Sequence, residues 1–257
     1  LNIGAASLTV TSPTGYDSAD DVDYKYTKVN SKTYVANWGA RGEECLFLST
    51  YAQSFYTGSY KYETLSELNG SSDRSSVPSS ALYKNLKSLM SNKQTYQTSY
   101  EATKSLFKYT DCLQNNTGNI SSFYSGKVLT SEWDSAKTWN REHTWPNSKG
   151  LGGRDEDDIM MLRPTSTSEN SSRGNTAYGE YYYDPNSESG GKYNLHGDVA
   201  RICLYVYVRW GNTQYMWGAS GVMESREVLL KWMEEDPVDT WELGRNDAVQ
   251  SITGTRN

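Results

Sequence analysis

Two adjacent side chains, Glu142 and His143, offer an acid and a base within the segment of residues 139–146. The chain has 257 residues and only 2 histidines, so His143 is one of few groups that can take up a proton near neutral pH. Neighbours on a strand point to opposite faces, so one of the pair can face a metal ion while the other faces a substrate. A carboxylate is a hard metal ligand, and a neutral imidazole can act as a general base.

A second polar cluster at residues 168–175 contains Asn170 and Arg173. The amide oxygen of Asn170 is a hard ligand that suits Mg²⁺, and the guanidinium of Arg173 suits a phosphate group. Together with Glu142 and His143, these groups predict metal-assisted hydrolysis of a phosphodiester. The competing interpretation of His143 is a structural histidine on a strand.

The order of these motifs resembles the bacterial endonuclease I family. The matching segments are residues 140–146 (NREHTWP), 162–165 (LRPT), 170–175 (NSSRGN), 197–201 (GDVAR) and 245–250 (RNDAVQ). The resemblance covers roughly residues 50–257 and leaves residues 1–44 unexplained. It implies a secreted, periplasmic or cell-surface nuclease without sequence specificity, built around a ββα-metal (His-Me) finger.

The resemblance also implies roles for single residues. His143 matches the general base that activates the attacking water, and Glu142 and Asn170 match the ligands of one Mg²⁺ ion, for which Mn²⁺ or Ca²⁺ could substitute in binding. The products would carry a 5′-phosphate, and the substrate would be DNA, with RNA as an alternative. An arginine near the scissile phosphate is expected, and Arg154 and Arg173 are the candidates.

Four further residues are candidates for support of the metal site or for contact with substrate: Asp158, Asn175, Arg141 and Arg163. Each has a plainer interpretation. The acidic run at residues 155–158 could be a solvated loop, Asn175 could cap a helix, and either arginine could pair with a nearby acid. His196 is expected to lie at the surface or to cap a helix.

Met160 is a departure from the family pattern, because many members carry a histidine at this position. A methionine neither accepts a proton nor binds Mg²⁺ well. We therefore keep a second hypothesis, a weak or inactive relative that binds nucleic acid or a cell-surface polymer. A carbohydrate- or envelope-binding module is a third, motivated by the 21 tyrosines and 8 tryptophans.

The net charge is −6 and the isoelectric point is about 5.1, so the long-range field repels polyanions. Any nucleic-acid site must therefore be a local group of Arg and Lys helped by a cation. The chain contains no apolar run long enough to span a membrane, and we expect a monomer. It begins without Met or a signal peptide, which we interpret as a processed or trimmed form.

The predicted fold is α+β, a helix-rich single domain at residues 45–257 with a strand-rich extension at residues 1–44. Helices are predicted at residues 82–90, 100–109, 165–175, 198–210 and 224–235, with Ser79 or Ser80 capping the first and Asn246 a last short one. Strands are predicted at residues 7–11, 32–36, 120–129 and 138–144, a loop at 70–73 and a turn at 115–118. Cys203 is expected in the core, and Cys45 and Cys112 are either paired or free.

Overall fold

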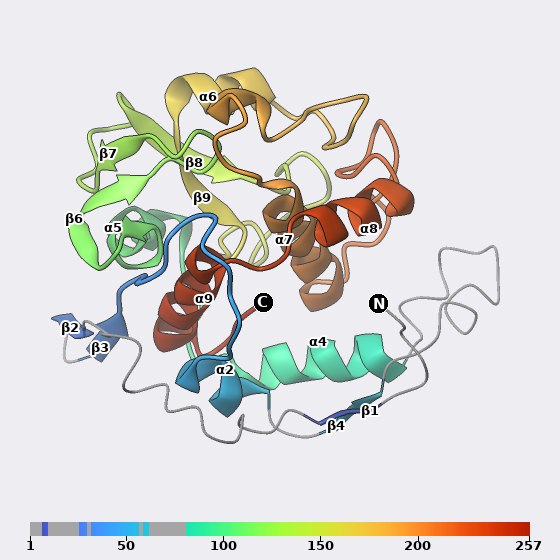
Figure 1. Ribbon diagram of the computed structural model, residues 1–257, viewed down its shortest axis with the longest axis horizontal. Coiled ribbons are helices and arrows are strands. Elements are labelled where there is room, and N and C mark those ends of the chain that lie inside the picture. Colours follow the sequence, from blue (N-terminus) through green and yellow to red (C-terminus); the bar gives the residue numbers. More distant parts are fainter. Residues whose placement is uncertain (1–6, 10–25, 30–31, 57–58, 62–80) are drawn as a thin grey trace.

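The computed structural model describes residues 7–9, 26–29, 32–56, 59–61 and 81–257 (Figure 1). The described α-helices are α2 (Thr50–Phe55), α4 (Ala81–Lys93), α5 (Tyr100–Thr110), α6 (Thr167–Arg173), α7 (His196–Arg209), α8 (Arg226–Glu235) and α9 (Thr240–Thr253). The described strands are β1 (Ser7–Thr9), β2 (Tyr26–Val29), β3 (Lys32–Val35), β4 (Ser59–Lys61), β5 (Cys112–Leu113), β6 (Asn116–Ser121), β7 (Val128–Thr130), β8 (Trp139–His143) and β9 (Leu162–Ser166). All pair antiparallel, which confirms the predicted α+β class.

The core lies around α7, whose apolar side chains are buried on several sides. Helix α7 packs against α8 and α4, whereas α5 packs against α9 and β6 (Figure 1). Cys203 is fully buried in α7, as the sequence predicts, and so are Trp139 and Trp145 on either side of the Glu142-His143 pair. Among the described helices, none has the length and apolar character that crossing a membrane requires.

The hairpin β8–β9 and the helix that follows it form the part of the fold that carries the motifs. Glu142 pairs with Arg163 and His143 with Leu162 across the hairpin. Helix α6 begins directly after β9, because the side chain of Ser166 accepts a hydrogen bond from the main-chain nitrogen of Glu169. It ends at Gly174, whose φ of +55° lies in the region that favours glycine.

Part of the predicted N-terminal extension packs on α5 and α9. The side-chain amide of Asn37 donates to the carbonyls of Thr110 and Trp241, at 3.1 and 3.2 Å. Gly39 lies so close to α9 that a Cβ there would be 1.8 Å from the carbonyl oxygen of Thr240. The division of the chain at residue 44 stays a prediction.

Some sequence-based boundaries are wrong. Residues 120–129 are not one strand: β6 ends at Ser121 and β7 begins at Val128, because Gly126, with a φ of +69°, closes a turn. Asn246 does not cap a helix, since α9 begins at Thr240 and is capped by Asp239. The predicted loop at residues 70–73 and the cap at residues 79–80 lie outside the described residues.

The other predicted helices are present with small shifts. Helix α7 begins two residues before its predicted start at Asp198, and α8 begins at Arg226 behind the capping side chain of Ser225. All three cysteines are free: Cys112 and Cys203 are buried, and Cys45 is half-buried.

Candidate active site

The alternation of β8 divides its side chains between two neighbours. Arg141 and His143 point toward Tyr100 at the start of α5. Asn140 and Glu142 point the other way, toward α6. The strand therefore presents its base and its acid to different surroundings, as the sequence predicts.

His143 is held by one hydrogen bond and one ring contact. Its Nε2 lies 3.0 Å from the main-chain oxygen of Glu156, and its ring stacks on Tyr100 at 5.5 Å between centroids and 21° between planes. A carbonyl oxygen only accepts, so Nε2 carries the hydrogen and Nδ1 keeps the lone pair of the neutral ring. Burial lowers the pKa of His143, although Glu156 opposes the change. The ring is therefore neutral at pH 7, with Nδ1 able to accept a proton.

Arg141 lies beside this base. Its guanidinium carbon is 3.5 Å from the centroid of the Tyr100 ring, and its Nη1 donates to the carbonyl of Tyr100 at 2.7 Å. A contact of 3.3 Å joins Nη1 to the exposed carboxylate of Glu101. The positive charge of Arg141 also helps to lower the pKa of His143.

Glu142 is almost completely buried, with 2 % of its surface exposed. Its Oε1 accepts a hydrogen bond of 2.7 Å from the hydroxyl of Tyr124 and lies 3.4 Å from Nη1 of Arg173. Burial raises the pKa of Glu142 to about 7, while Arg173 and Tyr124 act in the opposite direction. Both polar contacts use Oε1, so Oε2 remains available for another partner.

Asn170 in α6 is oriented by Asn140 in β8. The amide nitrogen of Asn170 donates to the side-chain oxygen of Asn140 at 2.7 Å, which leaves the amide oxygen of Asn170 for a further ligand. Glu142 is on the same face of β8 as Asn140. One carboxylate oxygen and one amide oxygen thus come from a strand and the helix packed on it.

Two hard oxygens of this kind suit a hard divalent cation that keeps several waters and needs few protein ligands. The pair does not resemble a site for a metal that demands many acidic or sulfur ligands. Within the described part of the chain, no group of three or more His, Cys, Asp or Glu side chains could hold a metal ion.

Arg173 is buried, at 1 % exposure, and does not reach the surface as a phosphate clamp would. It donates to the main-chain oxygens of His143 at 3.2 Å, Gly174 at 3.1 Å and Thr144 at 2.9 Å. Its guanidinium carbon lies 4.5 Å from the ring centroid of Tyr178. These contacts tie α6 to the end of β8.

Arg154, the other predicted phosphate ligand, is exposed in the loop between β8 and β9. Its guanidinium lies 3.4 Å from the side-chain oxygen of Gln97, and its main-chain oxygen accepts from the Gln97 amide at 3.0 Å. The same loop supplies the Glu156 carbonyl that meets His143. Arg154 is therefore a surface residue of the loop that also holds the proposed base.

The remaining candidates have different surroundings. Asp158 is buried and accepts hydrogen bonds from Tyr205 at 2.8 Å and Trp210 at 2.9 Å, so it fastens the loop to α7. Arg163 is buried 3.5 Å from Asp111, and its burial, with the nearby Arg245, lowers its pKa to about 9. Asp158 and Arg163 therefore hold parts of the fold together.

Asn175 is exposed just after α6, where a polymer could touch it.

The two histidines have separate environments. His196 stacks on Trp232 at 4.1 Å and pairs with Asp184 at 2.9 Å. His196 is half-buried and is the first residue of α7, but it does not cap the helix, because Leu195 is the N-cap and no side chain caps this end.

Sequence reasoning missed Tyr100, Tyr124 and the carbonyl of Glu156. Tyr100 stands at the start of a predicted helix, but its contact with His143 joins two distant segments. Tyr124 lies in a turn that the sequence predicts as strand. A main-chain carbonyl has no signature in the sequence.

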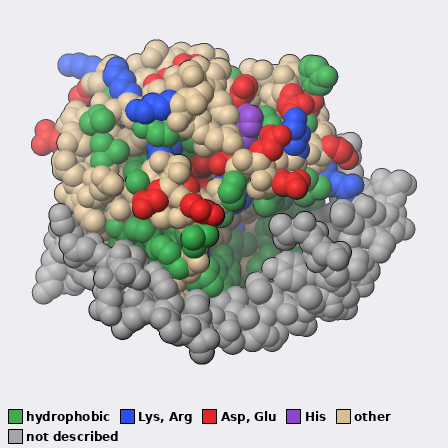
Figure 2. Space-filling view, viewed as in Figure 1, with side chains coloured by type: hydrophobic (Ala, Val, Ile, Leu, Met, Phe, Trp, Pro, Cys, Tyr) green, Lys and Arg blue, Asp and Glu red, His purple; other side chains and the backbone are tan. Residues whose placement is uncertain are grey.

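One face of the molecule carries many acidic side chains (Figure 2). Asp and Glu side chains lie around a central hollow in which hydrophobic side chains gather (Figure 2).

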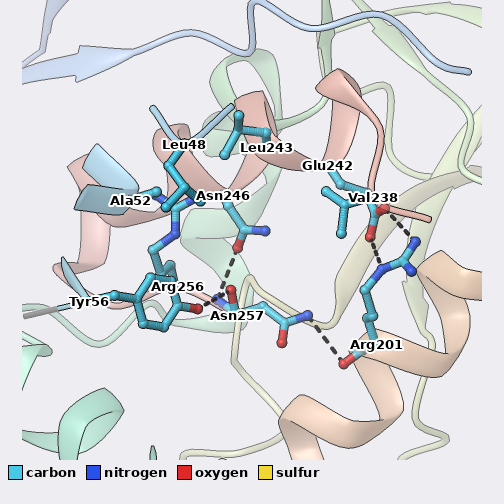
Figure 3. Close-up of a pocket in the computed structure, with 10 residues that line it drawn as sticks. All are labelled: Leu48, Ala52, Tyr56, Arg201, Val238, Glu242, Leu243, Asn246, Arg256 and Asn257. Atoms are coloured by element: carbon cyan, nitrogen blue, oxygen red, sulfur yellow. Dashed lines mark hydrogen bonds and ion pairs between the residues drawn. The ribbon is translucent and has the colours of Figure 1, made fainter. Parts of the chain in front are cut away.

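A cavity of about 220 Å³ lies between α2, α9 and the last described residues, and it is separate from the β8–α6 site. There the Arg201 guanidinium faces the Glu242 carboxylate, and the Tyr56 hydroxyl reaches the main-chain oxygen of Asn257 (Figure 3).

Comparison with known proteins confirms the family resemblance over a somewhat shorter part of the chain than residues 50–257. An extracellular ribonuclease from Bacillus amyloliquefaciens is 32% identical over 176 residues, which cover 59% of this chain and 61% of the relative. An extracellular ribonuclease from Bacillus subtilis (strain 168) is 31% identical over 176 residues, with the same shares of 59% and 61%. The chain thus matches about three-fifths of the length of these relatives. The model of the Endonuclease I family matches residues 78–257, and the chain belongs to this family.

Proposed function

We propose that this protein is a divalent-metal-dependent endonuclease that hydrolyses nucleic acid without sequence specificity. One observation carries the proposal: the last two residues of β8 offer a hard oxygen, on Glu142, and a neutral imidazole nitrogen, on His143, and Asn170 of the adjoining α6 adds a second hard oxygen. We assign β8, β9 and α6 to a ββα-metal finger. Family membership supports metal dependence, and Mg²⁺ is the ion that the oxygen pair fits best.

Each residue of the site has its own role in the proposed reaction. Nδ1 of His143 takes a proton from the water that attacks phosphorus, while the Glu156 carbonyl and the Tyr100 ring keep the imidazole in place. Glu142 and Asn170 hold the cation, which when bound offsets the charge on the phosphate and on the leaving 3′ oxygen. The bond that breaks is the one to the 3′ oxygen, so the products carry a 5′-phosphate.

The arginines have distinct roles in this proposal. Arg154, which is exposed in the loop between β8 and β9, and Arg141, which is half-buried beside His143, contact the phosphate backbone. Arg173 instead positions β8 and α6, because its Nη1 and Nη2 donate to main-chain oxygens. Contacts with the backbone rather than with base edges give no sequence preference.

The relatives are named extracellular ribonucleases, which supports secretion and makes RNA as plausible a substrate as DNA. Supercoiled plasmid and a single-stranded RNA should therefore be incubated with the protein under Mg²⁺, Mn²⁺, Ca²⁺ or a chelator. We expect cleavage of at least one substrate that the chelator abolishes. Ligation of the products without prior phosphorylation identifies the 5′-phosphate.

The two histidines provide a matched pair of variants. His143→Asn should lower the rate about 10²- to 10⁴-fold, and His196→Asn should leave it near that of the wild type. If the plasmid and the RNA both remain intact with Mg²⁺, Mn²⁺ and Ca²⁺, the proposal is contradicted. If the protein then still binds nucleic acid, it is a binding module rather than an enzyme.

A further inference from the structure

Behind Glu142 lie two tyrosines that the mechanism above does not use. Tyr124 comes from the turn between β6 and β7, and Tyr178 follows α6. Both are completely buried. Their hydroxyl oxygens are 2.6 Å apart, and that of Tyr124 is 2.7 Å from Oε1 of Glu142.

The directions of these hydrogen bonds follow from the number of hydrogens. The single hydroxyl hydrogen of Tyr124 points to Glu142, so Tyr124 can only accept from Tyr178. The chain therefore runs from Tyr178 through Tyr124 to the carboxylate. Each hydrogen bond polarises the next, which strengthens the hydrogen bond from Tyr124 to Oε1 of Glu142.

The pair leaves the two oxygens of Glu142 unequal. Oε1 receives the Tyr124 hydroxyl and faces Arg173, whereas neither contact reaches Oε2. Oε2 is therefore the carboxylate oxygen that these two contacts leave for a cation. Rotation of the carboxylate to offer both oxygens would break the bond to Tyr124.

Tyr124 is itself fixed by its neighbours. Ser122 and Ser125, on either side of it in the turn, donate to the buried carboxylate of Glu169 in α6 at 2.6 and 2.7 Å. The ring of Tyr124 packs edge-on against Tyr183 at 5.4 Å. The helix that carries Asn170 thus also holds the turn that carries Tyr124.

We propose that Tyr124, backed by Tyr178, is a positioning residue that restricts Glu142 to one metal-binding oxygen and thereby favours Mg²⁺ over Ca²⁺. This inference rests on the proposed function. Mg²⁺ accepts few protein oxygens and retains its waters, whereas Ca²⁺ takes six to eight oxygens and often both oxygens of a carboxylate. A carboxylate limited to one oxygen therefore suits the smaller ion.

The test is direct binding of Mg²⁺ and Ca²⁺ to the whole chain by calorimetry, without nucleic acid. We expect Tyr124→Phe to weaken Mg²⁺ binding about tenfold, the usual size of such an outer contact, and to weaken Ca²⁺ binding much less. Tyr178→Phe keeps the bond between Tyr124 and Glu142, so it should shift the preference in the same direction by less. Tyr83→Phe is the control, because the Tyr83 hydroxyl donates to the main-chain oxygen of Tyr207 in α7.

The outcomes separate the two proposals. A preference for Mg²⁺ that falls at least fivefold in Tyr124→Phe and stays constant in Tyr83→Phe supports the inference. An unchanged preference overturns it, even if both affinities fall, and leaves the proposed nuclease intact. If the wild-type chain binds neither ion, both proposals fail. If Tyr124→Phe does not fold, as judged by its thermal transition, Tyr178→Phe decides in its place.

Discussion

Nη1 of Arg173 in α6 lies 3.2 Å from the main-chain oxygen of His143 at the end of β8. The same guanidinium donates to Thr144 and faces the buried Glu142. One side chain thus fixes the end of the strand that carries the proposed base. It also forms an ion pair with the carboxylate of Glu142, the residue before that base.

Replacement of Arg173 by Ala should therefore destabilise the protein strongly. It removes the Arg173 hydrogen bonds to three carbonyls and the cationic partner of the buried Glu142 carboxylate, and loss of one member of a buried ion pair costs about 3–5 kcal/mol. Urea unfolding at pH 7 measures the change. Arg154→Ala is the matched control, because a substitution at an exposed arginine should change stability by less than about 0.5 kcal/mol. Equal stabilities of the two variants would contradict the role given to Arg173.

How the motifs would be arranged was largely predictable from the sequence. The sequence predicts a strand at residues 138–144 and a short helix at residues 165–175, so Glu142, His143 and Asn170 are expected on neighbouring elements. The period of two along a strand also predicts that Glu142 and His143 face opposite sides. These are local properties, which local patterns encode.

The contacts that complete the site were not predictable, because they join distant segments. No pattern around Tyr100 or Tyr124 signals the approach of β8. The role of Arg173 was also not predictable from its residue type. A guanidinium suits a phosphate and a main-chain carbonyl equally well, and only burial, which depends on the whole fold, distinguishes the two.

The rate of cleavage should fall as the pH falls through the pKa of His143. Burial lowers this pKa below its ordinary value of 6.5, and only the neutral ring can accept a proton. With saturating Mg²⁺, which also keeps Glu142 ionised, the acid limb should therefore have its midpoint below 6.5. Arg141 helps to lower the pKa, so Arg141→Ala should move the midpoint to higher pH. A midpoint above 7 in the wild type would contradict His143 as the base.

Met160 should prove to be a core residue rather than a defective site residue. It is buried, and Arg245 donates to its main-chain oxygen at 3.2 Å and lies 4.0 Å from its sulfur. Met160→His puts an imidazole beside a buried cation and should lower stability by about 1–3 kcal/mol without raising the rate of cleavage. Met160→Leu, which conserves volume, should cost less than about 1.5 kcal/mol. A gain in rate from Met160→His would show that this position supports the site.

Three buried or half-buried acids, Asp236 at the end of α8 and Asp239 and Glu242 at the start of α9, should make the protein less stable as the pH rises. Burial, followed by the charge of Asp198, raises the pKa of Asp236 to about 7, of Asp239 to about 6 and of Glu242 to about 8. A carboxyl whose pKa is raised by folding binds a proton that the unfolded chain has already lost. The stability gained in this way is present at low pH and is lost as the pH rises through about 4 to 8.

Asp198→Asn tests this acidic group. Asp198 is 3 % exposed, and its Oδ1 has no hydrogen-bond partner among the described residues. Removal of its charge should lower the three raised pKa values and reduce the loss of stability between pH 5 and pH 8.5 by about 1 kcal/mol. Thermal unfolding at both pH values gives the difference, with Asp155→Asn in the loop as control. A steeper pH dependence in Asp198→Asn would contradict the argument.

The three cysteines should react in two classes, because burial separates Cys112 and Cys203 from Cys45. Burial raises the pKa of each of the first two thiols to about 12, so at pH 8 only about one in ten thousand of these groups is the reactive thiolate. Cys45 is half-buried and should react first with an aromatic disulfide reagent in the native protein. The other two should react only as the chain unfolds, and Cys45→Ser should remove the fast phase alone. Three thiols should be counted in denaturant without reductant; a count of one would mean that two of them are joined in a disulfide.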